Sequence, residues 1–237
     1  GVAAGSPGAG ASGASGATGA EASRAAGADT DAADAIVAAA RREDRLPLVV
    51  VCAGPLTNVA EALRRDPGIA GRFTLSWVGG TLASATAGGE YNLDTDRAAA
   101  EHALAAVGPA LRRFPLETYR RCAWSVPQLE DVLTTQGGAL GAWLWRRFLE
   151  LPLPEEVEVD AVWPLGDSCP LVGTALSPES SDWRVEPDGS RVCTRLDDRL
   201  VLGDLTALLR RHARQASRPT DTAADLQTHP TSDGSPS

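Results

Sequence analysis

The sequence predicts an α/β fold in which an open, mainly parallel sheet is flanked by helices. Short apolar or alternating segments, typical of strands, take turns along the chain with segments whose apolar residues recur at the helical period. The clearest example is residues 48–65, where an apolar run passes through a glycine turn into a helix. In open parallel sheets the ligand crevice lies just beyond the carboxyl ends of the strands, so this corner is the first candidate for a functional site.

The first predicted elements are a helix, a strand and a second helix. An amphipathic pattern over residues 34–42 predicts the first helix, and the unbroken apolar run Leu48–Cys52 predicts a strand buried on both faces. The next helix follows Thr57. It ends at or before Asp66, because Pro67 disfavours helical geometry in the residue ahead of it.

A second strand and a third helix lie on either side of a glycine-rich loop. Alternating apolar residues predict a strand over residues 73–77, and the Gly79–Gly80 pair ends it. Beyond the loop we expect a helix over Arg97–Val107, capped by Asp94 or Thr95.

The second half of the chain predicts shorter strands and three further helices. The expected segments are a strand over 111–119 that Pro115 interrupts, helices over 127–133 and 140–151, a strand over 157–163, two short strands around a turn at 186–189, and a helix over 205–214.

Both ends of the chain are too poor in large apolar residues to form a core. Residues 1–30 consist mainly of Gly, Ala and Ser, and residues 213–237 are rich in Ser, Thr, Pro and Asp. We therefore expect disordered segments at 1–30 and 213–237 around one folded domain over 31–212. Because the chain begins with glycine and contains no methionine, we also expect that its natural beginning either was removed by processing or is not represented, and we favour the second interpretation.

Composition excludes several classes of function. A net charge of -9 argues against a nucleic-acid-binding surface, and basic pairs such as Arg112–Arg113 are scattered, as expected of solvated faces. With no run of about 20 apolar residues, we expect no membrane span. The cysteines show no C-x-x-C spacing and no nearby histidine, which indicates buried, reduced thiols in a cytoplasmic protein. They are Cys52, Cys122, Cys169 and Cys193.

Four short blocks carry a resemblance to a known family. They are Cys52–Asn58 followed by Asp66–Pro67, then Val78–Gly80, then Glu90–Asn92 followed by Asp94, and finally Pro164–Asp167. In this order and spacing, over roughly residues 32–212, the chain resembles the inosine-uridine-preferring nucleoside hydrolases. The resemblance implies a Rossmann-like nucleoside hydrolase fold, here without the family's amino-terminal Asp-rich motif. It also implies hydrolysis of the N-glycosidic bond of ribonucleosides to free base and ribose.

The resemblance implies a site for ribose and calcium. Glu90 and Asn92 match the residues that bind ribose, while the backbone carbonyl of Thr57 and the carboxylate of Asp167 match two ligands of calcium. The catalytic residues stay unknown. The aspartate cluster that supplies the general base is not found, and Gly166 stands where the family often carries the histidine that protonates the leaving base.

Each candidate also has an ordinary structural interpretation. Thr57 or Asp167 could instead cap a helix, and Glu90 and Asn92 could be solvated turn residues. Ser84 falls where an asparagine that contacts ribose is expected. Only the joint order of the blocks favours the functional interpretation.

The sequence thus predicts a calcium-assisted nucleoside N-ribohydrolase of cytoplasmic purine and pyrimidine salvage, acting on ribonucleosides as a homodimer or homotetramer. We expect impaired activity in this chain alone, since it offers two candidate ligands and no leaving-group acid. One alternative is a catalytically inactive nucleoside-hydrolase-like binding or scaffold protein. Another is that the chain does not fold stably, because missing strands would expose a sheet edge.

Overall fold

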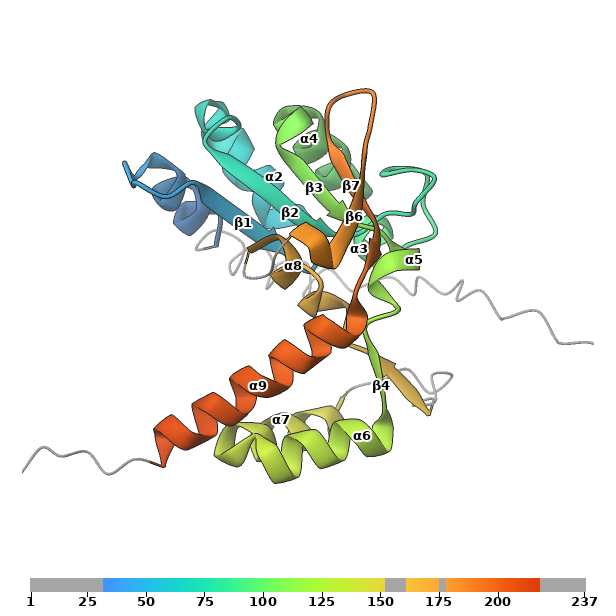
Figure 1. The fold of residues 1–237 in the computed structure, drawn as a ribbon. Helices are drawn as coiled ribbons and strands as arrows, with labels where there is room; N and C mark the ends of the chain where they lie inside the picture. The colour runs from blue at the N-terminus through green and yellow to red at the C-terminus, as the bar shows by residue number, and fades with distance from the viewer. Residues whose placement is uncertain (1–31, 152–160, 175–177, 218–237) are drawn as a thin grey trace, which may run out of the picture. The chain divides into compact units, whose positions relative to one another are not determined.

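The computed structural model describes residues 32–151, 161–174 and 178–217, which form two compact units (Figure 1). The first unit runs to Leu116 and includes Trp183–Thr194. The second holds Glu117–Asp182 and continues from Arg195. The expected disorder of residues 1–30 lies outside the described residues.

The larger sheet has the strand order β1-β2-β3-β7-β6. Its strands are β1 (Leu48–Cys52), β2 (Phe73–Val78), β3 (Leu111–Phe114), β6 (Ser181–Val185) and β7 (Arg191–Leu196). The pairs β1–β2, β2–β3 and β3–β7 are parallel, which confirms the mainly parallel sheet.

The predicted burial of β1 on both faces is wrong. In the described part of the chain β1 ends the sheet, and Val51 is 48% exposed. An unbroken apolar run indicates a fully buried strand only when neighbouring strands and helices cover that strand. A strand at the edge of a sheet lacks some of these neighbours.

Helices cover this sheet and form the core with it. Residues 32–41 are helical, and α2 (Thr57–Arg65) ends where Pro67 requires it to. The short helix α3 (Tyr91–Thr95) leads into α4 (Arg97–Val107). The core includes fully buried side chains from α2, α4 and β2 and from their borders, among them Leu56, Leu63, Leu75, Trp77 and Ala100.

The helix over Arg97–Val107 is confirmed, but its expected cap is not. Asp96 is the N-cap, and its side chain accepts a hydrogen bond from the backbone N–H of Ala99 at 3.0 Å. Asp94 instead accepts from Gly89 N–H and pairs with Arg97. Asp96 lies one residue nearer the helix than Thr95, within the usual uncertainty of helix boundaries.

The second unit contains a two-stranded sheet and a helical layer. Its strands β4 (Ala123–Ser125) and β5 (Val162–Pro164) are antiparallel. Its helical segments are α5 (Leu116–Tyr119), α6 (Val126–Asp131), η3 (Val132–Gln136), α7 (Gly138–Leu149), η4 (Gly166–Ser168), α8 (Leu171–Thr174), η5 (Pro178–Ser180) and α9 (Asp198–Ala216). Aromatic packing joins α7 to β5, where the rings of Phe148 and Trp163 meet edge to face at 5.1 Å.

Three predictions for the later elements need adjustment. Pro115 ends β3 rather than interrupting it, and the chain turns into α5. The last helix begins at Asp198, because Asp197 caps it by accepting from Leu200 N–H, and it continues past residue 212. Of the strand expected over 157–163, residues 157–160 lie outside the described residues and β5 begins at Val162.

The four cysteines form no disulfide with one another in the described residues. None of the helices in those ranges combines the length and apolar character that a bilayer crossing requires.

Candidate active site

Parallel strands bring three of the predicted site residues to one edge of the sheet. The turn after β1 leads to Thr57 at the start of α2, and the loop after β2 leads to Glu90 and Asn92 at the start of α3. Since β1 and β2 are adjacent and parallel, both connections leave from their carboxyl ends. Trp77, near the end of β2, joins that strand to the turn after β1, because its Nε1 donates to the carbonyl of Gly54 at 3.1 Å.

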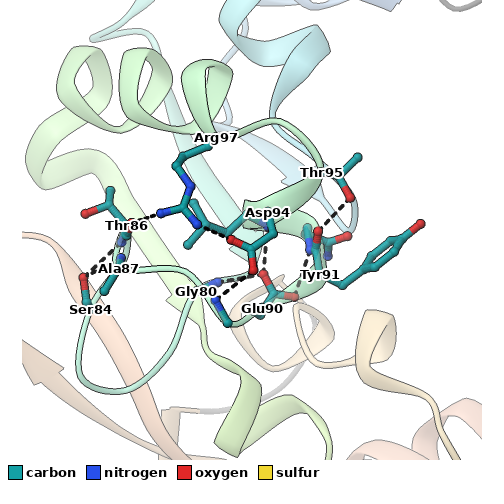
Figure 2. Close-up of polar contacts among 12 residues, drawn as sticks. Gly80, Ser84, Thr86, Ala87, Glu90, Tyr91, Asp94, Thr95 and Arg97 are labelled. Carbon is teal, nitrogen blue, oxygen red and sulfur yellow. Dashed lines mark hydrogen bonds and ion pairs between the residues drawn. The ribbon is translucent and has the colours of Figure 1, made fainter. Parts of the chain in front are cut away.

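Glu90 is a buried carboxylate held by the main chain. It is 3% exposed, and it caps α3 by accepting from the N–H groups of Asn92 at 3.1 Å and Leu93 at 3.0 Å. A third backbone donor, Gly80 N–H, reaches its Oε2 at 3.0 Å from across the loop (Figure 2). The interpretation of Glu90 as a solvated turn residue is therefore wrong.

Asn92 is 9% exposed and fixed to the end of β2. Its Nδ2 donates to the carbonyl of Val78 at 2.9 Å, which sets the plane of the amide. Ser84 stabilises the loop between β2 and α3, because its hydroxyl accepts from the N–H groups of Thr86 at 3.1 Å and Ala87 at 3.0 Å (Figure 2). Asn92, like Glu90, is buried rather than solvated.

Thr57 links two helices instead of capping one. The N-cap of α2 is Leu56 and provides no side-chain hydrogen bond. The Thr57 hydroxyl donates to Oδ2 of Asp96 at 2.6 Å, so it connects α2 to α4. Beside it, Oδ1 of Asn58 is buried and has no hydrogen-bond partner among the described residues.

Asp167 belongs to the second unit, where it lies in the 3-10 turn η4. The residue is exposed, yet partial burial of its carboxyl raises its pKa. The alternative interpretation has Asp167 capping the short helix that residues 170–176 suggest; that helix is present as α8 (Leu171–Thr174), and the capping role stays an interpretation.

Gly166 is required by the ring of Tyr119. A Cβ added at Gly166 would lie 2.6 Å from Cδ2 of Tyr119, well inside van der Waals contact. A histidine at this position would need that ring to move.

The described residues contain no ready-made cluster of metal-binding side chains. No three His, Cys, Asp or Glu side chains in those ranges lie close enough together to hold a metal ion. Calcium takes about six to eight oxygen ligands. Thr57 and Asp167, which belong to different units, do not form such a set by themselves.

A family comparison identifies the kind of protein that carries this site. The family model described as inosine-uridine preferring nucleoside hydrolase matches residues 2–223. The chain belongs to the inosine-uridine preferring nucleoside hydrolase family. The resemblance based on the four blocks is thereby confirmed, and so is the fold class.

Solved nucleoside hydrolase structures share the fold of this family member. An inosine-guanosine nucleoside hydrolase is 17% identical, with a TM-score of 0.56, and the match covers 75% of this chain and 66% of that one. A purine-preferring ribonucleoside hydrolase from Gardnerella vaginalis is 17% identical, with a TM-score of 0.53, covering 77% and 66%. An inosine-uridine preferring nucleoside hydrolase from Bacillus anthracis is 19% identical, with a TM-score of 0.53, covering 76% and 65%.

The chain thus spans slightly less than two thirds of the length of these structures. No curated protein sequence matched it.

Two residues that shape the site were missed or misjudged from the sequence. Asp96 was passed over as the partner of Thr57, and Arg113, expected on a solvated face, is 4% exposed. Arg113 donates to the carbonyls of Thr81 and Ser84 in the loop before Glu90. The sequence signal that could have shown its burial is the alternation along the strand, which places Arg113 on the same face as Leu111.

A hollow lined in part by Ala39, Arg45 and Arg72 lies at the amino end of β1. The candidate site lies at the opposite, carboxyl edge of the sheet.

Proposed function

We propose that the protein hydrolyses the N-glycosidic bond of ribonucleosides and releases free base and ribose. Membership of the nucleoside hydrolase family supports this reaction class. The observation that carries the proposal is the Glu90 carboxylate, which is buried at the carboxyl edge of the sheet and held by three backbone N–H groups. Glycosyl transfer passes through an oxocarbenium-like transition state, so a fixed negative group beside the sugar is the feature it needs.

In this proposal Glu90 accepts a hydrogen bond from a ribose hydroxyl, and its charge stabilises the positive charge that develops on the sugar. Because the main chain already fixes both oxygens, little reorganisation is needed at the moment of reaction. Asn92 lies two residues on, with its amide oriented by Val78, and it contacts a second hydroxyl. Water adds to the anomeric carbon while the bond to the base breaks. The water loses one proton as its oxygen bonds to that carbon and the leaving base gains one, so hydroxyl goes to ribose and hydrogen to the base; the groups that accept and donate these protons are not assigned among these residues.

We also propose calcium as the cofactor, with the backbone carbonyl of Thr57 and the carboxylate of Asp167 as two of its ligands. Partial burial raises the pKa of the Asp167 carboxyl, and a cation bound beside it would stabilise the charged carboxylate. Two oxygens fall short of the about six to eight that calcium takes, so we expect weak calcium affinity and impaired turnover in this chain alone.

The setting we propose is cytoplasmic purine and pyrimidine salvage, with the chain acting as a homodimer or homotetramer. Four cysteines without a disulfide among them in the described residues suit a reducing compartment.

The test is a hydrolysis assay with the purified chain, using inosine and uridine in calcium and in EGTA. We expect slow release of base above the uncatalysed rate, an equal amount of ribose, and a lower rate in EGTA. Chromatography measures the base and a reducing-sugar assay the ribose. No release from either nucleoside in calcium would contradict the proposal.

One observation favours a second candidate, a catalytically inactive binding or scaffold protein. The place where the leaving-group histidine is expected carries Gly166, and the ring of Tyr119 fills the space a side chain would need. Titration calorimetry separates the two candidates: nucleoside binding without any release of ribose over hours supports the scaffold.

A further inference from the structure

Three arginines from three elements hold one loop by its backbone carbonyls. The loop joins β2 to α3 and ends at Glu90. Its donors come from β3, α4 and β6, so the loop is fixed from several directions. The contacts are Arg113 to the carbonyls of Thr81 and Ser84, Arg184 to that of Leu82 at 2.8 Å, and Arg97 to that of Thr86 at 3.2 Å (Figure 2 shows the last).

Arg113 differs from the other two because it is buried. It is 4% exposed, whereas the Arg184 and Arg97 side chains are about half exposed. Removing a guanidinium from water is costly unless its donors are used. Here Nη1 of Arg113 donates to both carbonyls, those of Thr81 and Ser84. The pKa of the Asp188 carboxyl is lowered, first by its hydrogen bonds with Ser190 and to a smaller extent by the charge of Arg113. Its charge therefore acts on the loop and on the β6–β7 turn.

The held loop is the one that fixes Glu90. Gly80 N–H donates to Glu90 Oε2 at 3.0 Å, and the next residue, Thr81, offers its carbonyl to Arg113. Gly80 itself has φ +68, a conformation that few other residues adopt, and its carbonyl accepts from Leu116 N–H at 2.9 Å. A displacement of Thr81 would therefore pull on the peptide that aims the Gly80 donor.

We propose that Arg113 is a positioning residue for Glu90: it holds the carbonyls of Thr81 and Ser84 so that Gly80 N–H keeps the carboxylate ready for ribose. Arg184 supports the same loop at Leu82. The inference rests on the proposed function for its link to substrate, but the positioning itself is measurable without substrate.

The test uses backbone amide exchange, followed by NMR, in Arg113→Lys. A lysine keeps the charge, but its side chain is shorter and its ammonium does not reach the place from which Nη1 of Arg113 donates to both carbonyls. Exchange at the amides of Gly80 and Leu93 should therefore rise about tenfold. Exchange at the core amide of Ala60 should change by less than about twofold, because a substitution has little effect on residues with which it shares no partner. Unchanged exchange at Gly80 would overturn the proposal.

The matched control is Arg112→Lys, on the same strand. Successive strand residues face opposite sides of the sheet, and among the described residues Arg112 donates to no loop carbonyl. Its exchange pattern should match that of the unaltered protein. If Arg113→Lys raises exchange at every amide, the second variant Arg184→Gln is measured. Faster exchange at the loop amides alone supports the proposal, and unchanged exchange at the loop amides overturns it.

A second readout separates this inference from the proposed function. If the unaltered chain releases base from inosine, Arg113→Lys should lower kcat, because a displaced Glu90 carboxylate stabilises the transition state less well, and Arg112→Lys should leave kcat and KM unchanged. An altered loop with an unchanged kcat would overturn the link to substrate. If the unaltered chain releases no base, the proposed function fails, and the exchange data still decide the positioning role.

Discussion

At the residue scale, the contact between Gly166 and the ring of Tyr119 restricts which residues position 166 can hold. The ring of Tyr119 lies where a Cβ at residue 166 would be, and both residues belong to the second unit. The glycine is thus a packing requirement of this chain. A histidine placed at residue 166 alone would not restore the family's arrangement.

We predict that Gly166→Ala lowers the free energy of unfolding by about 1–3 kcal/mol, the usual cost of overpacking. Gly173→Ala is the matched control, because a Cβ there meets nothing within 4 Å and alanine is the better helix former. Urea denaturation of both variants measures the difference. Equal stability of the two would show that Tyr119 moves freely out of the way.

Glu90 and Asn92 were predictable as candidates from the sequence, but their surroundings were not. The Glu-x-Asn block and its glycine-rich approach are visible in the chain. The partners Gly80 and Val78 lie ten and fourteen residues earlier, and only the folded loop brings them near. The buried role of Arg113 was missed for the same reason, since a basic pair usually indicates a solvated face.

At the element scale, strands and helices with a strong period were predicted well, whereas pairing was not. The β1 strand has its predicted bounds, yet its edge position depends on which neighbours the chain supplies. The turn at 186–189 indicated two strands without indicating that β7 pairs with β3. Strand order is set by long-range contacts that local periodicity does not encode.

The link between α2 and α4 makes a prediction about Thr57. Thr57→Val removes the hydroxyl that donates to Asp96, and we expect a loss of about 1 kcal/mol in unfolding free energy. Thr57→Ser keeps the hydroxyl and is the control. Because the proposed calcium ligand at this residue is a backbone carbonyl, calcium affinity measured by calorimetry should be the same in both. A weaker affinity in Thr57→Val alone would contradict the carbonyl assignment.

The position of β1 at the end of the sheet in the described residues predicts self-association. In the described residues β1 has a partner on one side only, and Val51 leaves an apolar side chain in solvent. Val51→Lys should shift the sedimentation-velocity distribution toward the monomer, since a charge blocks edge pairing. Val50→Lys should instead destabilise the fold, because Val50 packs against the core. An unchanged distribution for Val51→Lys would contradict the edge account.

At the scale of the whole molecule, the family and the fold class followed from the order of the blocks and the alternation of elements. The match over residues 2–223 and the solved relatives bear out both. The division into two units was not visible in the sequence, because segments from separate parts of the chain build each unit. Glu90 and Asn92, the ribose part of the candidate site, both lie within the first unit, so substitutions in that unit test their role.

The most direct test of the central claim is base release from inosine by Glu90→Gln beside Glu101→Gln. Glu101 is an exposed glutamate on α4, so it controls for loss of one negative charge. The amide cannot supply two anionic acceptors to three N–H groups, so thermal unfolding of each variant is followed to confirm that it is folded during the assay. We expect kcat/KM to fall about 100-fold or more in Glu90→Gln, the usual loss when a group that stabilises the transition state is removed, and to stay near the unaltered value in Glu101→Gln. Equal base release by the two folded variants would contradict the assignment of Glu90 to ribose and with it the proposed site.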